Sequence, residues 1–135
     1  MEKIHKTLVL VTAVIAASVL LHCQAQQFSI TQTEWKLVSL PGETIDQSNP
    51  PTLTFDEATK KISGFGGCNR FFGGYESTEN RIKFSALGST KMFCQDKMSL
   101  EDNYFKALQE ADSFRVEGST LQLIVANRVI LEFKK

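Results

Sequence analysis

Histidine most often supplies the general base that works near neutral pH, and it is also the commonest zinc ligand. The 135-residue chain has two histidines, His5 and His22. Both precede Gln26, where we expect the mature protein to begin once an export signal is removed. The mature chain then contains no imidazole, which excludes Ser–His, Cys–His and histidine-bearing metal mechanisms. We therefore predict no catalytic residue, no metal site and no cofactor.

Cysteine is the other side chain able to do chemistry here, and the chain has three, Cys23, Cys68 and Cys94. Because Cys23 lies at the predicted end of the export signal, Cys68 and Cys94 remain as a pair in an oxidising compartment. The favoured interpretation is a disulfide, which closes a loop of about 26 residues and stabilises the fold by roughly 3.5 kcal/mol in the chain-entropy model. Two buried free thiols or a redox-active pair are the alternatives, although no C-x-x-C motif lowers a thiol pKa.

A glycine-rich run, Gly64 to Arg70, has the composition of a nucleotide-binding loop. A dinucleotide fingerprint must open a helix, whereas this run precedes the strand-like segment Phe71 to Tyr75. We therefore interpret the glycines as permitting turns and close backbone approach beside the cysteine pair, with Asn69 hydrogen-bonded within its own turn. The adjacent carboxylates Asp56 and Glu57 are interpreted as solvated charges at another turn.

All ten phenylalanines follow the predicted signal, and most are expected in the core of a small β domain. The alternative is that some line a cavity for an apolar ligand. Phe71 and Phe72 are consecutive in a predicted strand, so we expect one of them to face outward unless a bulge intervenes, and an exposed ring there would mark a contact surface. The candidate interaction loop comprises Gly67, Asn69, Arg70, Phe71 and Phe72.

The elements that position these residues are mainly strands, because short segments rich in aromatic and branched residues alternate with polar connections of hairpin length. Thr90 to Cys94 is a candidate ninth strand. The eight predicted strands are Glu34–Leu40, Thr52–Asp56, Lys61–Phe65, Phe71–Glu76, Arg81–Ser85, Ser113–Val116, Thr120–Val125 and Val129–Phe133.

One helix is predicted over Ser99 to Ala111, with Ser99 as its N-cap and acidic Glu101 in its first turn. Asp102 and Lys106 are expected to pair on its exposed face. The fold class is therefore mainly β with one α-helix. We expect a strongly bent antiparallel sheet or a partly open barrel with the helix packed on it.

The N-terminus has the layout of an export signal, since Lys3 and Lys6 precede fourteen uncharged residues from Leu8 to Leu21. Fourteen helical residues span roughly 21 Å, less than the ~30 Å hydrocarbon core of a bilayer. Two cleavage schemes stay open: lipidation of Cys23, as in a bacterial lipoprotein, or ordinary cleavage after Ala25. We accordingly predict a signal peptide over residues 1–25 and one domain over residues 26–135, in an exported protein that is lipid-anchored in the cell envelope or periplasmic or secreted.

The charge balance of the chain changes when the signal is removed. The full chain has 15 basic and 15 acidic residues, and the loss of Lys3, Lys6 and Glu2 leaves 13 and 14, a net charge of −1. This near-neutrality gives no electrostatic reason to expect nucleic acid as a partner. We expect a monomer.

Two motifs resemble the META domain family, which includes HslJ-like exported bacterial proteins. They are GCNRF at Gly67–Phe71 and TKMFC at Thr90–Cys94, within a match running from about Trp35 to Phe133. The resemblance implies a compact antiparallel β domain with one helix, often in lipoproteins associated with heat or antibiotic stress, virulence or secretion. It implies no established enzymatic activity and no catalytic residues. Only the Cys68 and Cys94 pair and the Gly67–Phe71 loop are transferred from the family, as structural features.

Three functions follow from these observations, in order of preference. The first is a non-enzymatic, stress-associated envelope protein that binds another protein or an envelope component. The second is a small carrier of an apolar ligand in a phenylalanine-lined cavity. The third is a thiol–disulfide enzyme using Cys68 and Cys94.

Overall fold

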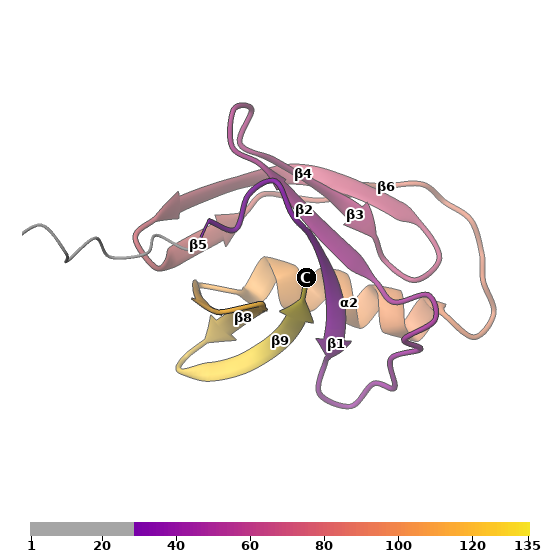
Figure 1. The fold of residues 1–135 in the computed structure, drawn as a ribbon. Helices are drawn as coiled ribbons and strands as arrows, with labels where there is room; N and C mark the ends of the chain where they lie inside the picture. The colour runs from indigo at the N-terminus through magenta and orange to yellow at the C-terminus, as the bar shows by residue number, and fades with distance from the viewer. Residues whose placement is uncertain (1–28) are drawn as a thin grey trace, which may run out of the picture.

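The computed structural model describes residues 29–135, and the predicted signal peptide with its lipidation candidate Cys23 lies outside the described residues. The described part contains nine strands and one helix (Figure 1). None of its helices is long and apolar enough to span a membrane. The elements are β1 (Glu34–Ser39), β2 (Thr52–Asp56), β3 (Lys61–Phe65), β4 (Arg70–Thr78), β5 (Arg81–Phe84), β6 (Gly88–Ser89), α2 (Met98–Glu110), β7 (Ser113–Glu117), β8 (Thr120–Val125) and β9 (Arg128–Lys134).

The strands form one antiparallel sheet in the order β3-β2-β1-β9-β8-β7-β5-β4-β6, and an additional pairing of β3 with β4 makes the sheet ring-like. The first and last strands of the chain are neighbours, because Leu37 of β1 is paired with Phe133 of β9. The shortest strand pairing in the ring is between β5 and β7, which share a single register pair, Arg81 with Ser113. This arrangement confirms the predicted bent antiparallel sheet.

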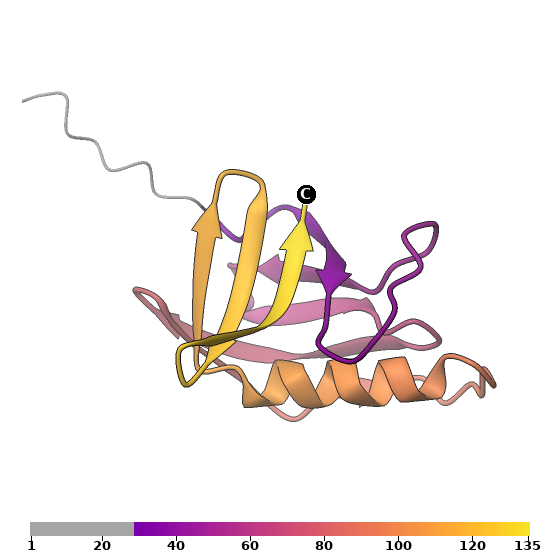
Figure 2. The same ribbon diagram turned by 90° about the horizontal axis from the view of Figure 1, so that it is seen from below.

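The helix packs against one side of this sheet, running along it from the β6 end to the start of β7 (Figure 2). It presents Leu100, Tyr104 and Leu108 inward, at the spacing of one helical face, and all three are buried. The Tyr104 ring contacts those of Phe71 and Phe133, so the helix joins β4 to β9 across the core. The interior is thus closed by side chains from the middle and from the C-terminal part of the chain.

The predicted strands agree closely with the structure, and β2, β3 and β8 have the expected bounds. Two predictions near the helix are wrong. Thr90–Cys94 forms no strand, since β6 is the short Gly88–Ser89 segment before it. The helix begins at Met98 with Lys97 at its N-cap position, because the Ser99 hydroxyl donates to Glu43 instead of capping the helix.

The predicted ion pair of Asp102 with Lys106 is also replaced. Both side chains are exposed as expected, but the Lys106 ammonium lies 3.9 Å from Glu110, one turn further along the helix. A surface pair of this kind contributes a few tenths of a kcal/mol in either arrangement, so the exchange does not affect the fold.

Candidate functional site

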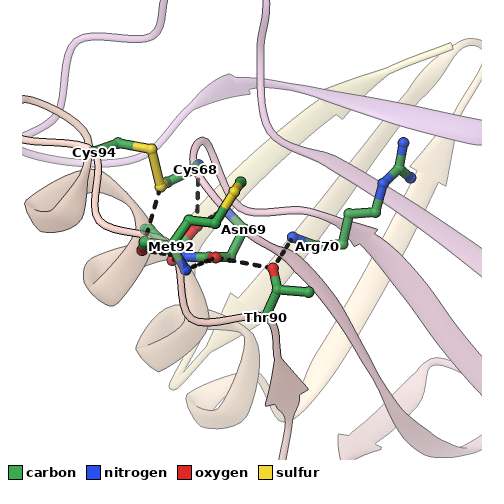
Figure 3. Close-up of a disulfide and its surroundings, with 7 residues drawn as sticks. Cys68, Asn69, Arg70, Thr90, Met92 and Cys94 are labelled. Atoms are coloured by element: carbon green, nitrogen blue, oxygen red, sulfur yellow. Dashed lines mark hydrogen bonds between the residues drawn. A yellow bond between two sulfur atoms is a disulfide. The ribbon is translucent and has the colours of Figure 1, made fainter.

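The two sequence motifs lie side by side although about 20 residues separate them. Phe71 and Phe72 of β4 are paired with Ser89 and Gly88 of β6. Beyond β6 the chain continues antiparallel to the residues before Phe71, and the Thr90 N–H donates to the Arg70 carbonyl. Figure 3 shows the result, with the GCNRF loop and the TKMFC segment facing each other. We call these two segments together the clamped loops.

A disulfide between Cys68 and Cys94 joins the two clamped loops (Figure 3). The Cys68 and Cys94 sulfurs are 2.04 Å apart, which confirms the predicted bond. Cys68 is 3% exposed, so an attacking thiolate would have to reach the bond from the half-buried Cys94 side. This burial is typical of a structural disulfide and argues against a thiol–disulfide enzyme.

The Asn69 side chain connects the two loops, rather than bonding within its own turn as predicted. Its amide oxygen accepts from the Met92 N–H at 2.7 Å and from the Thr90 hydroxyl at 2.9 Å. Its amide nitrogen donates to the Met92 carbonyl at 3.0 Å. The prediction failed because an Asn side chain can bond to any backbone within reach, and the sequence does not show that Met92 lies opposite.

Glu101 of α2 holds the Cys68–Asn69 part of the clamped loops from the side of the helix. It is 3% exposed, and its carboxylate accepts from the N–H groups of Cys68 and Asn69 and, at 2.7 Å, from the Asn69 side-chain amide. A buried carboxylate needs such partners, because an unpaired buried charge is costly. We call this set of contacts the Glu101–Asn69 network.

This role of Glu101 was not among the predictions, which placed the residue only in the first helical turn. The signal was present, since Glu101 lies three, four and seven residues before Tyr104, Phe105 and Leu108 and therefore on the apolar face of the helix. A charged residue on a buried stripe indicates an internal partner.

Gly66 allows the helix to approach the loop this closely. A Cβ at Gly66 would lie 2.7 Å from the Glu101 carboxylate and 2.7 Å from the Phe105 ring, closer than real Cβ contacts. The next residue, Gly67, has φ +116°, a conformation that favours glycine. Gly66 and Gly67 therefore permit close approach and a turn, as predicted.

Phe71 and Phe72 point to opposite sides of β4, as their adjacency predicted. Phe71 is 2% exposed and packs against Tyr104 and Phe105, whereas Phe72 is 64% exposed. On the neighbouring segment Met92 is 60% and Phe93 79% exposed. Val129 is the one other large apolar side chain exposed within residues 29–135. We call Phe72, Met92 and Phe93 the apolar edge.

Comparison with known proteins connects this geometry to a family. The model of the META domain family matches residues 28–135. The chain belongs to the META domain family. Within residues 29–135, the sheet, the one helix and the disulfide are those that the resemblance of the two motifs predicted.

Solved structures share the fold of this META domain. An NMR structure of a protein from Burkholderia xenovorans is 26% identical, covers 84% of this chain and 95% of its own, and has a TM-score of 0.61. A second protein solved by NMR is 26% identical, with coverages of 78% and 90% and a TM-score of 0.62. A crystal structure of a DUF4847 family protein from Bacteroides vulgatus, 13% identical with coverages of 78% and 93% and a TM-score of 0.59, shows the shared fold alone. No curated protein matches the chain.

The interior of the META domain is occupied by packed rings. Phe55 contacts Tyr75 and Phe84, while Phe71 contacts Tyr104 and Phe105. Burial raises the pKa of Tyr104 well above its usual value, and its hydroxyl donates to the Thr52 carbonyl at 3.0 Å. The aromatic side chains that an internal ligand cavity would require thus serve as core, which argues against the apolar-ligand carrier.

The remaining candidates from the sequence lie at the surface of the META domain. Arg70 is exposed. Asp56 and Glu57 are exposed as predicted, and the Thr59 N–H that donates to Asp56 lowers the pKa of that carboxyl. Within residues 29–135 no three His, Cys, Asp or Glu side chains are grouped so as to hold a metal ion.

Proposed function

We propose that this META domain is an exported, non-enzymatic, stress-associated protein of the cell envelope that acts by binding a protein or another envelope component. The observation that supports binding is the apolar edge, because Phe72, Met92 and Phe93 expose large apolar side chains on adjacent segments. Such exposure is costly in water unless a partner covers it.

The rigidity of the clamped loops supports the same proposal. Met92 is bonded through its N–H and its carbonyl to Asn69, and Phe93 lies between Met92 and the disulfide-bonded Cys94. The apolar edge is therefore presented in one fixed backbone arrangement. Preorganisation of this kind lowers the entropy lost on binding.

A non-enzymatic role is supported by the inventory of reactive groups. Residues 26–135 contain no histidine. Glu101, the buried carboxylate of the described residues, already accepts three hydrogen bonds, so its oxygens are engaged in holding the loops. Export and envelope location are supported by the signal-like sequence before Gln26, and stress association by the family.

Affinity capture from envelope extract tests the proposal, with residues 26–135 as bait. The comparison bait combines Phe72→Ser, Met92→Ser and Phe93→Ser, and Val129→Ser is the matched control because it removes an exposed apolar side chain elsewhere. We expect a component that is retained by the wild type and by Val129→Ser but lost from the triple variant. Identical retention by all three baits, or none above a denatured bait, would contradict the proposal.

A further inference from the structure

The apolar edge lies where the charge of the domain is locally reversed. The clamped loops and their continuation, residues 67–72 and 88–97, contain three cations, Arg70, Lys91 and Lys97, against one anion, Asp96, a net charge of +2. The domain over residues 26–135 has a net charge of −1. An overall negative protein therefore presents a positive end.

Two of these cations are available to a partner. Lys97 lies 3.8 Å from Asp46 and is compensated within the domain. Arg70 and Lys91 are exposed and form no ion pair with any described residue. Figure 3 shows the Arg70 side chain extending away from the disulfide.

The other end of the same strands differs. There Lys61 lies directly opposite Asp56, and Lys83 lies directly opposite Glu76 in the strand register. Cross-strand pairs of opposite charge neutralise each other at this spacing. Lys36 of β1 lies opposite Lys134 of β9, so uncompensated positive charge also occurs elsewhere in the sheet, and what distinguishes this end is that its cations lie beside three exposed large apolar side chains.

The segment that carries Met92 and Phe93 is accessible to a flat surface such as a bilayer. The segment joining β6 to α2, which contains Met92 and Phe93, loops outward at one end of the domain (Figure 1). The main surface hollows of residues 29–135 lie along β4, β5, β7 and β8, and none of them is lined by Phe72, Met92 or Phe93. The apolar edge therefore lies outside these hollows.

Resting on the function proposed above, we propose that the apolar edge docks on an anionic lipid bilayer. Phe72, Met92 and Phe93 enter the interface between headgroups and acyl chains, where aromatic side chains are favoured. Arg70 and Lys91 contact the anionic headgroups from the rim. Proteins bound at a membrane surface commonly combine the insertion of apolar side chains with the attraction of cationic side chains to anionic headgroups.

The proposal gives each residue a separate signature. Removing one cation beside the surface weakens binding to an anionic bilayer about five-fold, and removing both weakens it about thirty-fold. Removing the Phe93 ring weakens binding about ten-fold or more, since a buried ring of this size contributes that much. Salt weakens the cationic contribution and leaves the apolar contribution in place.

Co-sedimentation with vesicles tests these signatures on residues 26–135, which contain β1 to β9, helix α2, the disulfide and the core described above. Folding of each variant is checked by cooperative unfolding followed through Trp35 fluorescence. The vesicles are phosphatidylcholine alone or phosphatidylcholine mixed with phosphatidylglycerol. We expect binding to the mixed vesicles that falls with added salt and is weak on phosphatidylcholine alone.

Two pairs of variants separate docking from general stickiness. Phe93→Ser and the double variant Arg70→Gln/Lys91→Gln should weaken binding by the stated factors. Their matched controls, Val129→Ser and the double variant Arg128→Gln/Lys134→Gln, remove the same kinds of side chain from β9 and should bind as the wild type. Binding that is absent, or equally affected by test and control variants, overturns the lipid assignment. If envelope capture still depends on the apolar edge in that case, the partner is a protein and the proposed function stands.

Discussion

The Glu101–Asn69 network predicts a specific pattern of stability changes. In Glu101→Gln, the side-chain oxygen can still accept from the N–H groups of Cys68 and Asn69, but the new amide nitrogen then faces the Asn69 amide nitrogen. Asn69 cannot turn its amide over, because its oxygen already accepts from Met92 and Thr90. One bond to a charged group is lost and one buried donor is left unsatisfied, which costs about 2–4 kcal/mol in free energy of unfolding.

Asn69→Asp should destabilise the domain more than Glu101→Gln does, but the two changes made together should partly compensate each other. Asn69→Asp places a second carboxylate against that of Glu101, a buried like-charge contact costing about 3–5 kcal/mol. Combined with Glu101→Gln, the new carboxylate at position 69 accepts from the new amide at position 101, so a donor again faces an acceptor. We expect the double variant to be about 2 kcal/mol more stable than the sum of the single changes implies.

Urea unfolding with the disulfide intact measures these differences. Trp35 is the single tryptophan and is fully buried, so its fluorescence reports the loss of the core. Glu110→Gln is the control, because it removes an exposed carboxylate from the same helix and should change stability by less than about 0.5 kcal/mol. Effects of Glu101→Gln and Asn69→Asp that add to within about 0.5 kcal/mol would refute the network.

Three further outcomes follow from the structure. Cys68→Ser/Cys94→Ser should lower the free energy of unfolding by roughly 3.5 kcal/mol, since the bond closes a 26-residue separation; urea midpoints unchanged from the oxidised wild type would contradict this. Gly66→Ala should destabilise the fold by about 1–3 kcal/mol, because its Cβ would overlap Glu101 and Phe105. An unaltered urea midpoint would contradict this and would show that the helix can move away from the loop. The raised pKa of Tyr104 keeps its phenol neutral in the folded state, while the unfolded phenol ionises near pH 10, so stability should fall as pH rises above about 10. Tyr104→Phe should show a smaller fall between neutral and alkaline urea midpoints, and an equal fall would exclude Tyr104 as the cause.

The strands could be predicted from the sequence because each is a short local pattern. β2, β3 and β8 alternate or concentrate apolar residues between polar turns, and such segments need no distant information. The helix and the acidic Glu101 of its first turn were predicted from the sequence, but its N-cap was not, because the Ser99 hydroxyl bonds to Glu43, which lies 56 residues away in a loop.

Some features of the candidate site could likewise be predicted from the sequence, and others could not. The disulfide followed from counting cysteines, and the outward turn of Phe72 followed from the two-residue period of a strand. The bonds of Asn69 to Met92 and of Glu101 to Cys68 depend on which segments become neighbours in space. No local pattern fixes those neighbours, although the two family motifs contain Cys68, Asn69 and Met92.

The pairing of β1 with β9 sets the order in which the domain can be completed. Leu37 and Phe133 are register partners 96 positions apart, counting 133 − 37. A chain emerging N-terminus first, from a ribosome or through a membrane pore, can form the hairpins of β1 to β5 early, since their partners are close in sequence. One edge of β1 stays open until the last residues arrive, and contacts of this length slow folding. The ring therefore cannot close before β9, the last strand of the chain, is free to pair with β1.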